Sequence, residues 1–462
     1  MERAIRAVGG VFYALLRLVL GSAVRLYYRR IEFRHAELLP PRGPLLVVAN
    51  HPASLTDVLV LGAAVPRRLH FVAYSGLFAH PLLGFALRLA GTVPVYRHED
   101  AAEQMHRNVE MFAECNRLLR EGGAVLIFPE GTSRSDRKVE RLKTGAARMA
   151  LAYEFAPEGA GDLVLLPIGL HFEERTAFRS DVLVTAGVPI PLADLREPNA
   201  RDPAAAVREL TDRIQGSLEK LILNVPSAEL AQLVRDIERL YLDDLREATP
   251  GAAELTLARG IADAIEFFRR NDPVRLHRIW VEVTAYRRKL AALDLRDQAV
   301  RELGGSRATA PRLVATFLVG APFALAGALL NWLPYRLCGP IGQLFAPDPT
   351  RVAFARIVCG VVLFPLAYAG VALALRHGAH WGLVPIAALL AASIPLGLAS
   401  LGWFGWLRRE RHRLRLTFLL SSNRPLVARL RLERRRIVRM LDAARKDYQA
   451  GLAVAGEGST GK

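Results

Sequence analysis

Three long apolar runs in the second half of the chain constrain its fold most. They cover residues 313–333, 357–375 and 383–407, each close to the ~20 residues that a membrane-spanning helix needs. Residues 376–380 separate the last two runs and are few enough to close a helical hairpin. The first run contains Pro322 and the sequence Asn331-Trp332-Leu333-Pro334, so we expect a re-entrant or interfacial segment there. Residues 307–407 are therefore predicted to form a membrane region.

The chain combines a large positive charge with an apolar composition. Its formal net charge is +17 and its pI is near 10.4, yet 52% of its residues are apolar. Nucleic-acid-binding proteins are usually basic and polar, and neither a zinc pattern nor a basic sheet with interleaved aromatic residues occurs here, so we expect no nucleic-acid partner. A basic and apolar chain fits the surface of an anionic membrane better, and we expect membrane lipids as partners.

A densely basic tail, residues 408–462, follows the last apolar run. The positive-inside rule predicts that this tail lies in the cytoplasm. If residues 31–225 lie there too, the number of complete spans is even. A solvated helix face is the alternative for the tail, but its position after an apolar hairpin favours contact with anionic lipid. Three scattered cysteines, without a CxxC pair, suit the reducing cytosol and indicate neither a disulfide framework nor a zinc site.

The amino-terminal segment, residues 1–30, is apolar from Val8 to Tyr28 but carries Arg17 and Arg25 within the run. The apolar core of a signal peptide contains no such charges. We therefore expect an amphipathic helix in the membrane interface, with its guanidinium groups reaching toward lipid phosphates. An ordinary amphipathic surface helix is the alternative.

Residues 31–225 alternate short apolar runs with helical patterns, for example over Glu103–Glu121 and Lys143–Glu154. Such alternation predicts an α/β domain with a mostly parallel sheet flanked by helices. Residues 226–306 then show helical spacing and are expected to form a helical subdomain. The predicted strands are Leu45–Ala49, Leu69–Val72, Val93–Val95, Ala124–Phe128, Leu163–Ile168 and Val182–Ala186.

A histidine and an aspartate occur together where the first of these strands meets a helix. His51 follows the strand directly, and Asp57 comes six positions later. A carboxylate bonded to one ring nitrogen fixes the tautomer of a histidine that acts as a base and stabilises the imidazolium that forms. An unpaired, exposed Asp57 or one that only caps the helix remains an alternative. His51 and Asp57 are the predicted catalytic residues.

Several cationic and polar side chains follow other strands. Arg97 ends one strand, and Glu130, Gly131, Thr132 and Arg134 follow the run Gly123–Ile127. Lys143 precedes a helix. In an open α/β sheet the ligand crevice lies beyond the carboxyl ends of the strands, so these cations are expected to bind a phosphate-bearing substrate there. Glu130 either bonds a substrate hydroxyl or holds the arginines in place.

Four segments occur in the order of the motifs of the glycerolipid acyltransferases. They are Asn-His-x5-Asp from Asn50, Val-Pro-Val-Tyr-Arg from Val93, Phe-Pro-Glu-Gly-Thr-Ser-Arg from Phe128 and Leu-Leu-Pro-Ile-Gly-Leu from Leu165. Residues 30–225 therefore resemble that family, which includes the PlsC-type 1-acylglycerol-3-phosphate acyltransferases and related glycerol-3-phosphate acyltransferases. The resemblance implies an acyltransferase-like fold and transfer of an acyl chain from acyl-CoA or acyl carrier protein to a glycerophosphate hydroxyl.

The resemblance also implies residue roles. His51 would be the base and Asp57 its orienting partner; Arg97 and the segment Glu130-Gly131-Thr132 would bind the acceptor, and Pro167 would shape the acyl-donor side. Five residues separate His51 from Asp57, where four are usual. This spacing, with a long carboxyl-terminal extension, is similar to the fungal acyltransferases that use glycerol-3-phosphate or dihydroxyacetone phosphate. Ser133 stands where many relatives carry arginine.

The expected protein is thus a membrane-bound O-acyltransferase of phospholipid synthesis, with its catalytic domain on the cytoplasmic face. It needs neither a metal nor a redox cofactor. A lipid-cleaving serine hydrolase would require a Gly-x-Ser-x-Gly elbow, which does not occur. A non-catalytic lipid-binding scaffold that keeps an acyltransferase-like fold is the other alternative.

Overall fold

The structure, a computed structural model, describes residues 2–96, 108–131, 141–156, 162–222, 228–249, 254–301, 310–346, 348–422 and 424–457. The chain divides into two compact units. The first contains Met1–Asn224 and Pro334–Leu366, and the second contains Val225–Leu333 and Ala367–Lys462.

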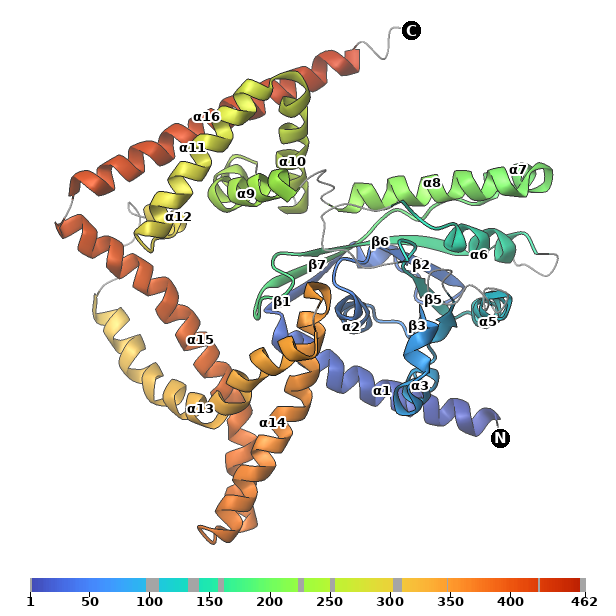
Figure 1. The fold of residues 1–462 in the computed structure, drawn as a ribbon, viewed down its shortest axis with the longest axis horizontal. Coiled ribbons are helices and arrows are strands. Elements are labelled where there is room, and N and C mark those ends of the chain that lie inside the picture. The colour runs from blue at the N-terminus through green and yellow to red at the C-terminus, as the bar shows by residue number, and fades with distance from the viewer. Residues whose placement is uncertain are drawn as a thin grey trace. The chain divides into compact units, whose positions relative to one another are not determined.

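A seven-stranded sheet forms the centre of the first unit (Figure 1). Its strand order is β1-β7-β6-β2-β5-β3-β4, and neighbours are parallel except for the antiparallel pair β6 and β7. The predicted fold class, a mostly parallel sheet flanked by helices, is therefore confirmed. The strands are β1 (Arg30–Arg34), β2 (Leu45–Ala49), β3 (Leu69–Tyr74), β4 (Val93–Val95), β5 (Ala124–Ile127), β6 (Val164–Phe172) and β7 (Asp181–Ala186).

All six predicted strands occur, and the sheet contains one further strand, β1, that was not predicted. Its sequence Arg-Ile-Glu-Phe-Arg alternates charged and apolar residues, whereas the buried strands are continuous apolar runs. Strand β1 lies at an edge of the sheet, where one side is free of a neighbouring strand and charged side chains remain accessible.

Helices cover both faces of this sheet. Alternate residues of β2 contribute to two separate cores: Leu46 and Val48 pack with α5, α6 and α8, while Leu45 and Val47 pack with α1 and α2. All residues of β2 are inaccessible to solvent. The helices of this part are α1 (Glu2–Tyr27), α2 (Leu55–Ala64), α3 (Pro81–Leu89), α5 (Asn108–Arg120), α6 (Gly145–Glu154), α7 (Arg196–Arg201) and α8 (Pro203–Leu221), with short 3-10 turns at Ala36–Leu38, Ser75–Phe78 and Ala193–Leu195.

Two arginines of α1 bind the carboxyl end of α2. The Nη2 atom of Arg17 donates to the Val65 carbonyl at 2.8 Å, and that of Arg25 donates to the Ala63 carbonyl at 2.6 Å. The last carbonyls of a helix lack intrahelical donors and carry partial negative charge, so they attract cations. The guanidinium groups thus point at protein carbonyls and not at lipid phosphates, which differs from the expectation for this segment.

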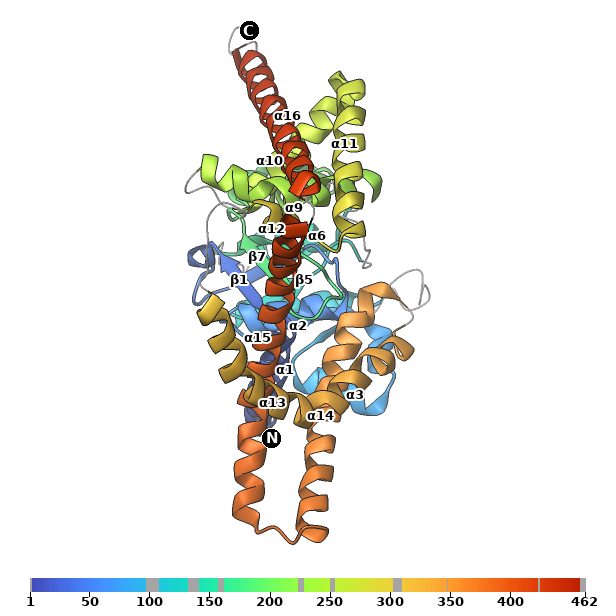
Figure 2. The same cartoon turned by 90° about the vertical axis from the view of Figure 1, so that its left-hand side faces the viewer.

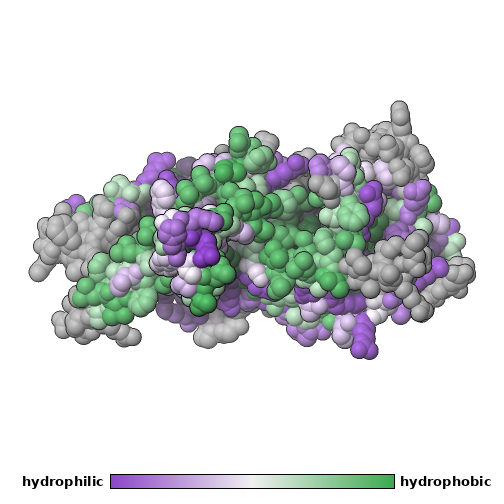
Figure 3. All heavy atoms as spheres, turned by 90° about the horizontal axis from the view of Figure 1, so that it is seen from below, coloured by the Kyte–Doolittle hydropathy of each residue, from purple (hydrophilic) through white to green (hydrophobic). Residues whose placement is uncertain are grey.

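Apolar side chains remain exposed on α1 and on the neighbouring α3. Leu18 of α1 is 66% exposed and Phe85 of α3 is 65% exposed. Figure 3 shows one face of the molecule on which hydrophobic residues predominate. Large exposed apolar areas are characteristic of surfaces that contact a partner or a membrane.

The second unit contains a separate helical core. The helices around this core are α9 (Ala228–Ala248), α10 (Glu254–Asn271), α11 (Pro273–Ala292), α12 (Asp297–Arg301) and α16 (Arg424–Glu457). Val427, Leu430 and Ile437 of α16 are almost fully buried against the other helices. The segment that sequence patterning assigned to a basic tail therefore contributes one of the helices of the subdomain.

Arg434 of α16 is charged but buried, so its charge does not show that it faces solvent or lipid. Its guanidinium is bound to Asp244 at 2.5 Å and to Asp297 at 3.0 Å, with the carbonyl of Leu240 as a further acceptor. Only 10% of the Arg434 side chain is exposed. This arginine is consequently unavailable to lipid, contrary to the expectation for the tail.

Four described helices contain segments long and apolar enough to cross a membrane by length and composition. They are Gly9–Tyr27 in α1, Phe317–Leu344 in α13 (Ala310–Leu344), Pro349–His377 around α14 (Val352–His377) and Leu383–Arg408 in α15 (Leu383–Ser422). The carboxyl end of α14 and the start of α15 form the predicted helical hairpin (Figure 2). Helix α13 continues through Pro322 and Pro334 without a break, and its re-entrant placement stays a prediction.

Polar contacts join the apolar helices within the second unit. The Asn331 amide donates to the carbonyls of Gly327 and Ser393 at 2.8 and 3.1 Å, and it accepts from the Tyr368 hydroxyl at 2.6 Å. Such bonds stabilise helix association where no water competes for the same groups.

Candidate active site

The site is built at the carboxyl end of β2, a strand inside the sheet (Figure 1). Asn50, the next residue, links β2 to β6. Its amide donates to the Leu170 carbonyl at 3.0 Å and accepts from the Leu170 N–H at 2.6 Å. Asn50 is 5% exposed, so both bonds are shielded from water. This pair of bonds fixes the backbone immediately before His51.

His51 and Asp57 are in contact. The Nδ1 atom of His51 lies 2.9 Å from Oδ2 of Asp57. Because an ionised carboxylate only accepts hydrogen bonds, a neutral His51 ring donates from Nδ1 and presents an unprotonated Nε2. The His51 side chain is 13% exposed, whereas that of Asp57 is completely buried. The exposed and capping-only alternatives for Asp57 are therefore excluded.

The turn between the two residues accommodates the long spacing. Asp57 lies in the first turn of α2, and the N–H of Ala53 donates to the same Oδ2 atom at 2.8 Å. Ser54, just before the helix, has φ 52° and ψ −131°, a backbone conformation that a residue with a Cβ rarely adopts. Strain of this kind costs ~1–3 kcal/mol and persists only where the surrounding structure imposes it.

The environment of Asp57 raises the pKa of its carboxyl group. Burial raises the pKa of Asp57, against the opposing effects of the hydrogen bond from His51, the N–H of Ala53 and the charge of Arg175. Its Oδ1 atom is buried and has no hydrogen-bond partner among the described residues. The single oxygen Oδ2 thus accepts from both the imidazole and the backbone.

Two residues after β5 position His51 from other directions. The ring of Phe128 stacks on the imidazole, with centroids 3.9 Å apart and an interplanar angle of 15°. The Oε1 atom of Glu130 accepts the backbone N–H of His51 at 3.0 Å. Glu130 is 7% exposed. One function of Glu130 is therefore to hold the His51 backbone, which neither sequence-based alternative included.

Gly131 and Lys143 lie close together. Gly131 has φ +72°, and a Cβ there would come within 2.9 Å of Cδ and Cε of Lys143. The Lys143 N–H donates to the Pro129 carbonyl at 2.8 Å. A glycine at this position lets the lysine side chain cross the backbone closely.

The other predicted binding residues have different outcomes. Arg97, Thr132 and Arg134 lie outside the described residues. Pro167 pairs with Val48 in the register of β6 and β2, and its suggested role toward the acyl donor stays a prediction. Within the described chain, no group of three or more His, Cys, Asp or Glu residues is arranged to hold a metal ion.

Sequence reasoning gave no role to Arg175, Asn50 or Phe128. Arg175 donates to the Pro52 carbonyl at 3.0 Å, in the turn between His51 and Asp57. It follows β6, some 120 positions away, so sequence proximity gave no signal. Asn50 and Phe128 lie inside two of the motifs, and this position in the sequence could have identified them as site residues.

Residues 30–171 match the family model described as Acyltransferase. The resemblance to the acyltransferases drawn from the motifs is therefore confirmed for this segment. Glycerol-3-phosphate O-acyltransferase 2 of Saccharomyces cerevisiae is 26% identical over 280 residues, which are 56% of this chain and 37% of that protein. The 1-acyl-sn-glycerol-3-phosphate acyltransferase alpha of Mus musculus is 34% identical over 139 residues, which are 30% of this chain and 46% of that protein.

The chain spans about a third of the length of the first curated relatives it matches. The structure of the 1-acyl-sn-glycerophosphate acyltransferase PlsC from Thermotoga maritima is 19% identical in sequence to this chain. The matched region covers 48% of this chain and 82% of the PlsC chain, with a TM-score of 0.33. The similarity to a yeast glycerol-3-phosphate acyltransferase agrees with the fungal-like His-x5-Asp spacing.

Proposed function

We propose that this protein is a membrane-bound glycerolipid acyltransferase. It transfers an acyl chain from acyl-CoA or acyl carrier protein to a hydroxyl of a glycerol-phosphate acceptor, either lysophosphatidate or glycerol-3-phosphate. The matched acyltransferase domain and the printed activities of the relatives support this reaction class. No metal or redox cofactor is required, because a thioester already carries a good leaving group.

The contact between His51 and the buried Asp57 carries the proposal. Nε2 of His51 takes the proton of the acceptor hydroxyl while the hydroxyl oxygen attacks the thioester carbonyl. Asp57 keeps the ring in the required tautomer and stabilises the imidazolium. Collapse of the tetrahedral intermediate expels the thiolate, which receives the proton from His51, and the ester remains on the acceptor.

Cations near the carboxyl ends of the strands bind the phosphate of the acceptor in this proposal. Lys143 lies beside Gly131, and Arg97, Thr132 and Arg134 retain the roles that the family motifs imply. Glycerol-3-phosphate and lysophosphatidate both present a hydroxyl near a phosphate, so one cationic site suits either acceptor. Glu130 supports this site by holding the His51 backbone.

We further propose that the acyltransferase domain lies on the cytoplasmic face of the membrane. The apolar helices α13, α14 and α15, together with the exposed leucines of α1, support membrane association. The basic residues that follow Leu407 support a cytoplasmic location of the carboxyl-terminal segment under the positive-inside rule.

Replacing His51 by alanine tests the proposed base. The full chain in phosphatidylcholine nanodiscs is incubated with labelled acyl-CoA and separate acceptors. We expect the wild type to acylate at least one acceptor and His51→Ala to lose ~10²–10⁴-fold in kcat. His277→Ala, which changes an exposed histidine on α11, is the control and should be unchanged.

Two outcomes contradict the proposal. Substantial turnover by His51→Ala would remove His51 from the mechanism. A wild-type protein that binds lipid but transfers no acyl chain, from either donor to any acceptor, would instead be the non-catalytic scaffold.

A further inference from the structure

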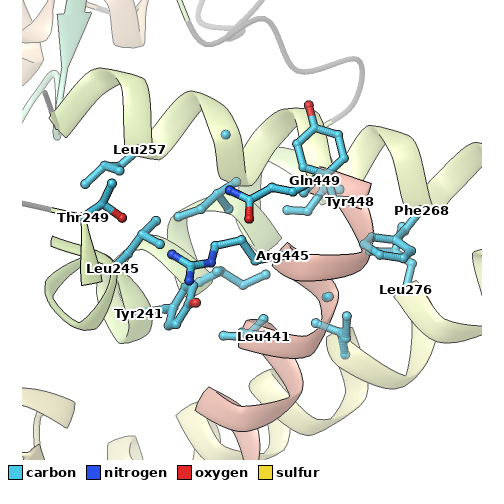
Figure 4. A pocket seen from close by; sticks show the side chains of 17 residues that line it. Tyr241, Leu245, Thr249, Leu257, Phe268, Leu276, Leu441, Arg445, Tyr448 and Gln449 are labelled. Atoms are coloured by element: carbon cyan, nitrogen blue, oxygen red, sulfur yellow. The ribbon is translucent and has the colours of Figure 1, made fainter. Parts of the chain in front are cut away.

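A cavity of about 270 Å³ lies inside the helical part of the second unit, between α9, α10, α11 and α16 (Figure 4). Its volume is close to the lower end of the ~300–1,000 Å³ typical of ligand pockets. Leu245, Leu257, Ile261, Phe268 and Leu441 are among the apolar residues that line it. The cavity is separate from the residues of the candidate active site, since all of its lining belongs to residues 237–279 and 441–449.

Arg445 breaks the apolar lining. Figure 4 shows its guanidinium reaching from α16 into the cavity toward Tyr241, with the amide of Gln449 nearby. The Nε atom of Arg445 is buried and has no hydrogen-bond partner among the described residues. A buried donor of a charged group without an acceptor is unfavourable, so an anion placed there would be stabilised.

Several other arginines of the same helices have carboxylate partners within the protein. Arg445 differs from them because no described carboxylate forms an ion pair with it. The Tyr241 hydroxyl beside it donates to Asp442, so that carboxylate already has a partner. Examples are Arg275 with Asp447, Arg434 with Asp244 and Asp297, and Arg436 with Glu282.

We propose that this cavity binds a single-chain anionic amphiphile, with its acyl chain along the apolar wall and its carboxylate or phosphate at Arg445. A neutral apolar ligand would leave Arg445 without an acceptor, and a small inorganic anion would leave the wall uncovered. The combination of one long apolar surface and one cation selects a ligand with both parts. Free fatty acids and lysophosphatidate share this chemistry.

Photolabelling tests the proposal with the full chain in phosphatidylcholine nanodiscs. The probe is a long-chain fatty acid with a diazirine in its chain, and mass spectrometry locates the adducts. We expect saturable labelling of α9, α10 or α16 peptides that line the cavity. Oleate or oleoyl-lysophosphatidate should displace the probe at concentrations at least tenfold lower than oleyl alcohol, and inorganic phosphate should not displace it. The more effective of the two anions identifies the class of head group.

Two variants separate the contributions of the wall and of the cation. A Cβ at Gly260 of α10 meets no atom within 4 Å, so Gly260→Leu fills open space, and leucine favours a helix more than glycine does. We expect it to reduce saturable labelling at least tenfold. Arg445→Gln should weaken oleate displacement about tenfold while leaving oleyl alcohol unchanged.

Two control variants test whether any substitution of these residue types changes labelling. The unfolding temperature of every variant is measured to show that it is folded. Gly216→Leu changes an equally open glycine of α8, and Arg439→Gln changes an exposed arginine of α16 outside the lining. Both control variants should be labelled like the wild type.

The inference is overturned if α9, α10 and α16 show no saturable labelling, if Gly260→Leu is labelled normally, or if Arg445→Gln affects displacement by oleate and by oleyl alcohol equally. Because Arg445→Gln removes little packing volume, it keeps the test decisive if Gly260→Leu unfolds. Labelling needs no turnover, so its result does not depend on the proposed acyl transfer.

Discussion

Substitution of Asp57 by asparagine examines the proposed dyad with little change in shape. Oδ2 of Asp57 accepts from His51 at 2.9 Å and from the Ala53 N–H at 2.8 Å. An asparagine whose oxygen takes the place of Oδ2 can keep both bonds. Its amide nitrogen would occupy the position of Oδ1, which has no partner among the described residues, so some loss of stability is expected.

The larger effect should fall on catalysis. When His51 accepts the hydroxyl proton, the imidazolium and the Asp57 carboxylate become opposite charges about 4 Å apart. At an effective dielectric constant of ~20 their attraction is ~4 kcal/mol. Losing that amount from the transition state lowers kcat roughly 10³-fold at 25 °C. The acceptor KM should change by less than about threefold, because His51 is neutral in the ground state of this mechanism.

The assay follows acyl transfer from labelled acyl-CoA in nanodiscs, with whichever acceptor the wild type uses. Asp236→Asn is a matched control, because Asp236 is a buried carboxylate of α9 that accepts from Gln232 and Arg287. We expect the control to retain wild-type kcat. A folded Asp57→Asn protein with kcat within tenfold of the wild type would refute the reasoning, as would an equal loss in the control.

Four further results are expected. Glu130→Ala should lower the free energy of unfolding by ~1–3 kcal/mol, because it leaves the partly buried N–H of His51 without its acceptor, and Glu130→Gln should cost less; equal losses in denaturant titrations would contradict this. Ser54→Gly should raise the unfolding temperature, since glycine adopts φ 52° without the Cβ strain, whereas Ser54→Val should lower it. Arg25→Gln should cost about 1.5 kcal/mol through the lost bond to the end of α2, and an unchanged unfolding midpoint would argue against that role. Burial raises the pKa of Asp57, so as pH falls the carboxylate should bind a proton, and kcat should decline, at a higher pH than for an ordinary aspartate; a pH–kcat profile that stays flat into the ordinary carboxyl range would contradict this.

The strands of the first unit were largely predictable because the sheet is buried on both faces. A strand with that environment reads as a continuous apolar run, as Leu45–Ala49 and Ala124–Ile127 do. Edge strand β1 gave a weaker signal because its charged residues remain accessible. Its pairing with β7, some 150 residues away, depends on the tertiary structure and not on local sequence.

The residues of the candidate site were easier to find than their contacts. The motif order singled out His51, Asp57 and Glu130, but not which atoms would meet. Glu130 reaches the backbone of His51 only because β5 lies next to β2 in the sheet. The same adjacency brings Phe128 onto the imidazole.

In the helical region the sequence predicted the helices but not which of them pack together. Spacing indicated helices in residues 226–306 and basic character after Leu407, but α16 joins the core of those helices through Val427, Leu430 and Ile437. Its buried Arg434 illustrates the reason: the sequence specifies a charge, and the fold specifies its partners.

By itself, the sequence determined the alternation of strands and helices, the apolar segments and the order of the acyltransferase motifs, because these are properties of neighbouring residues. Only the tertiary structure decided that Asp57 is buried against His51, that Glu130 holds the His51 backbone and that Arg445 enters an apolar cavity. Burial, hydrogen-bond partners and cavities depend on residues brought together from distant parts of the chain, and local pattern carries little information about them.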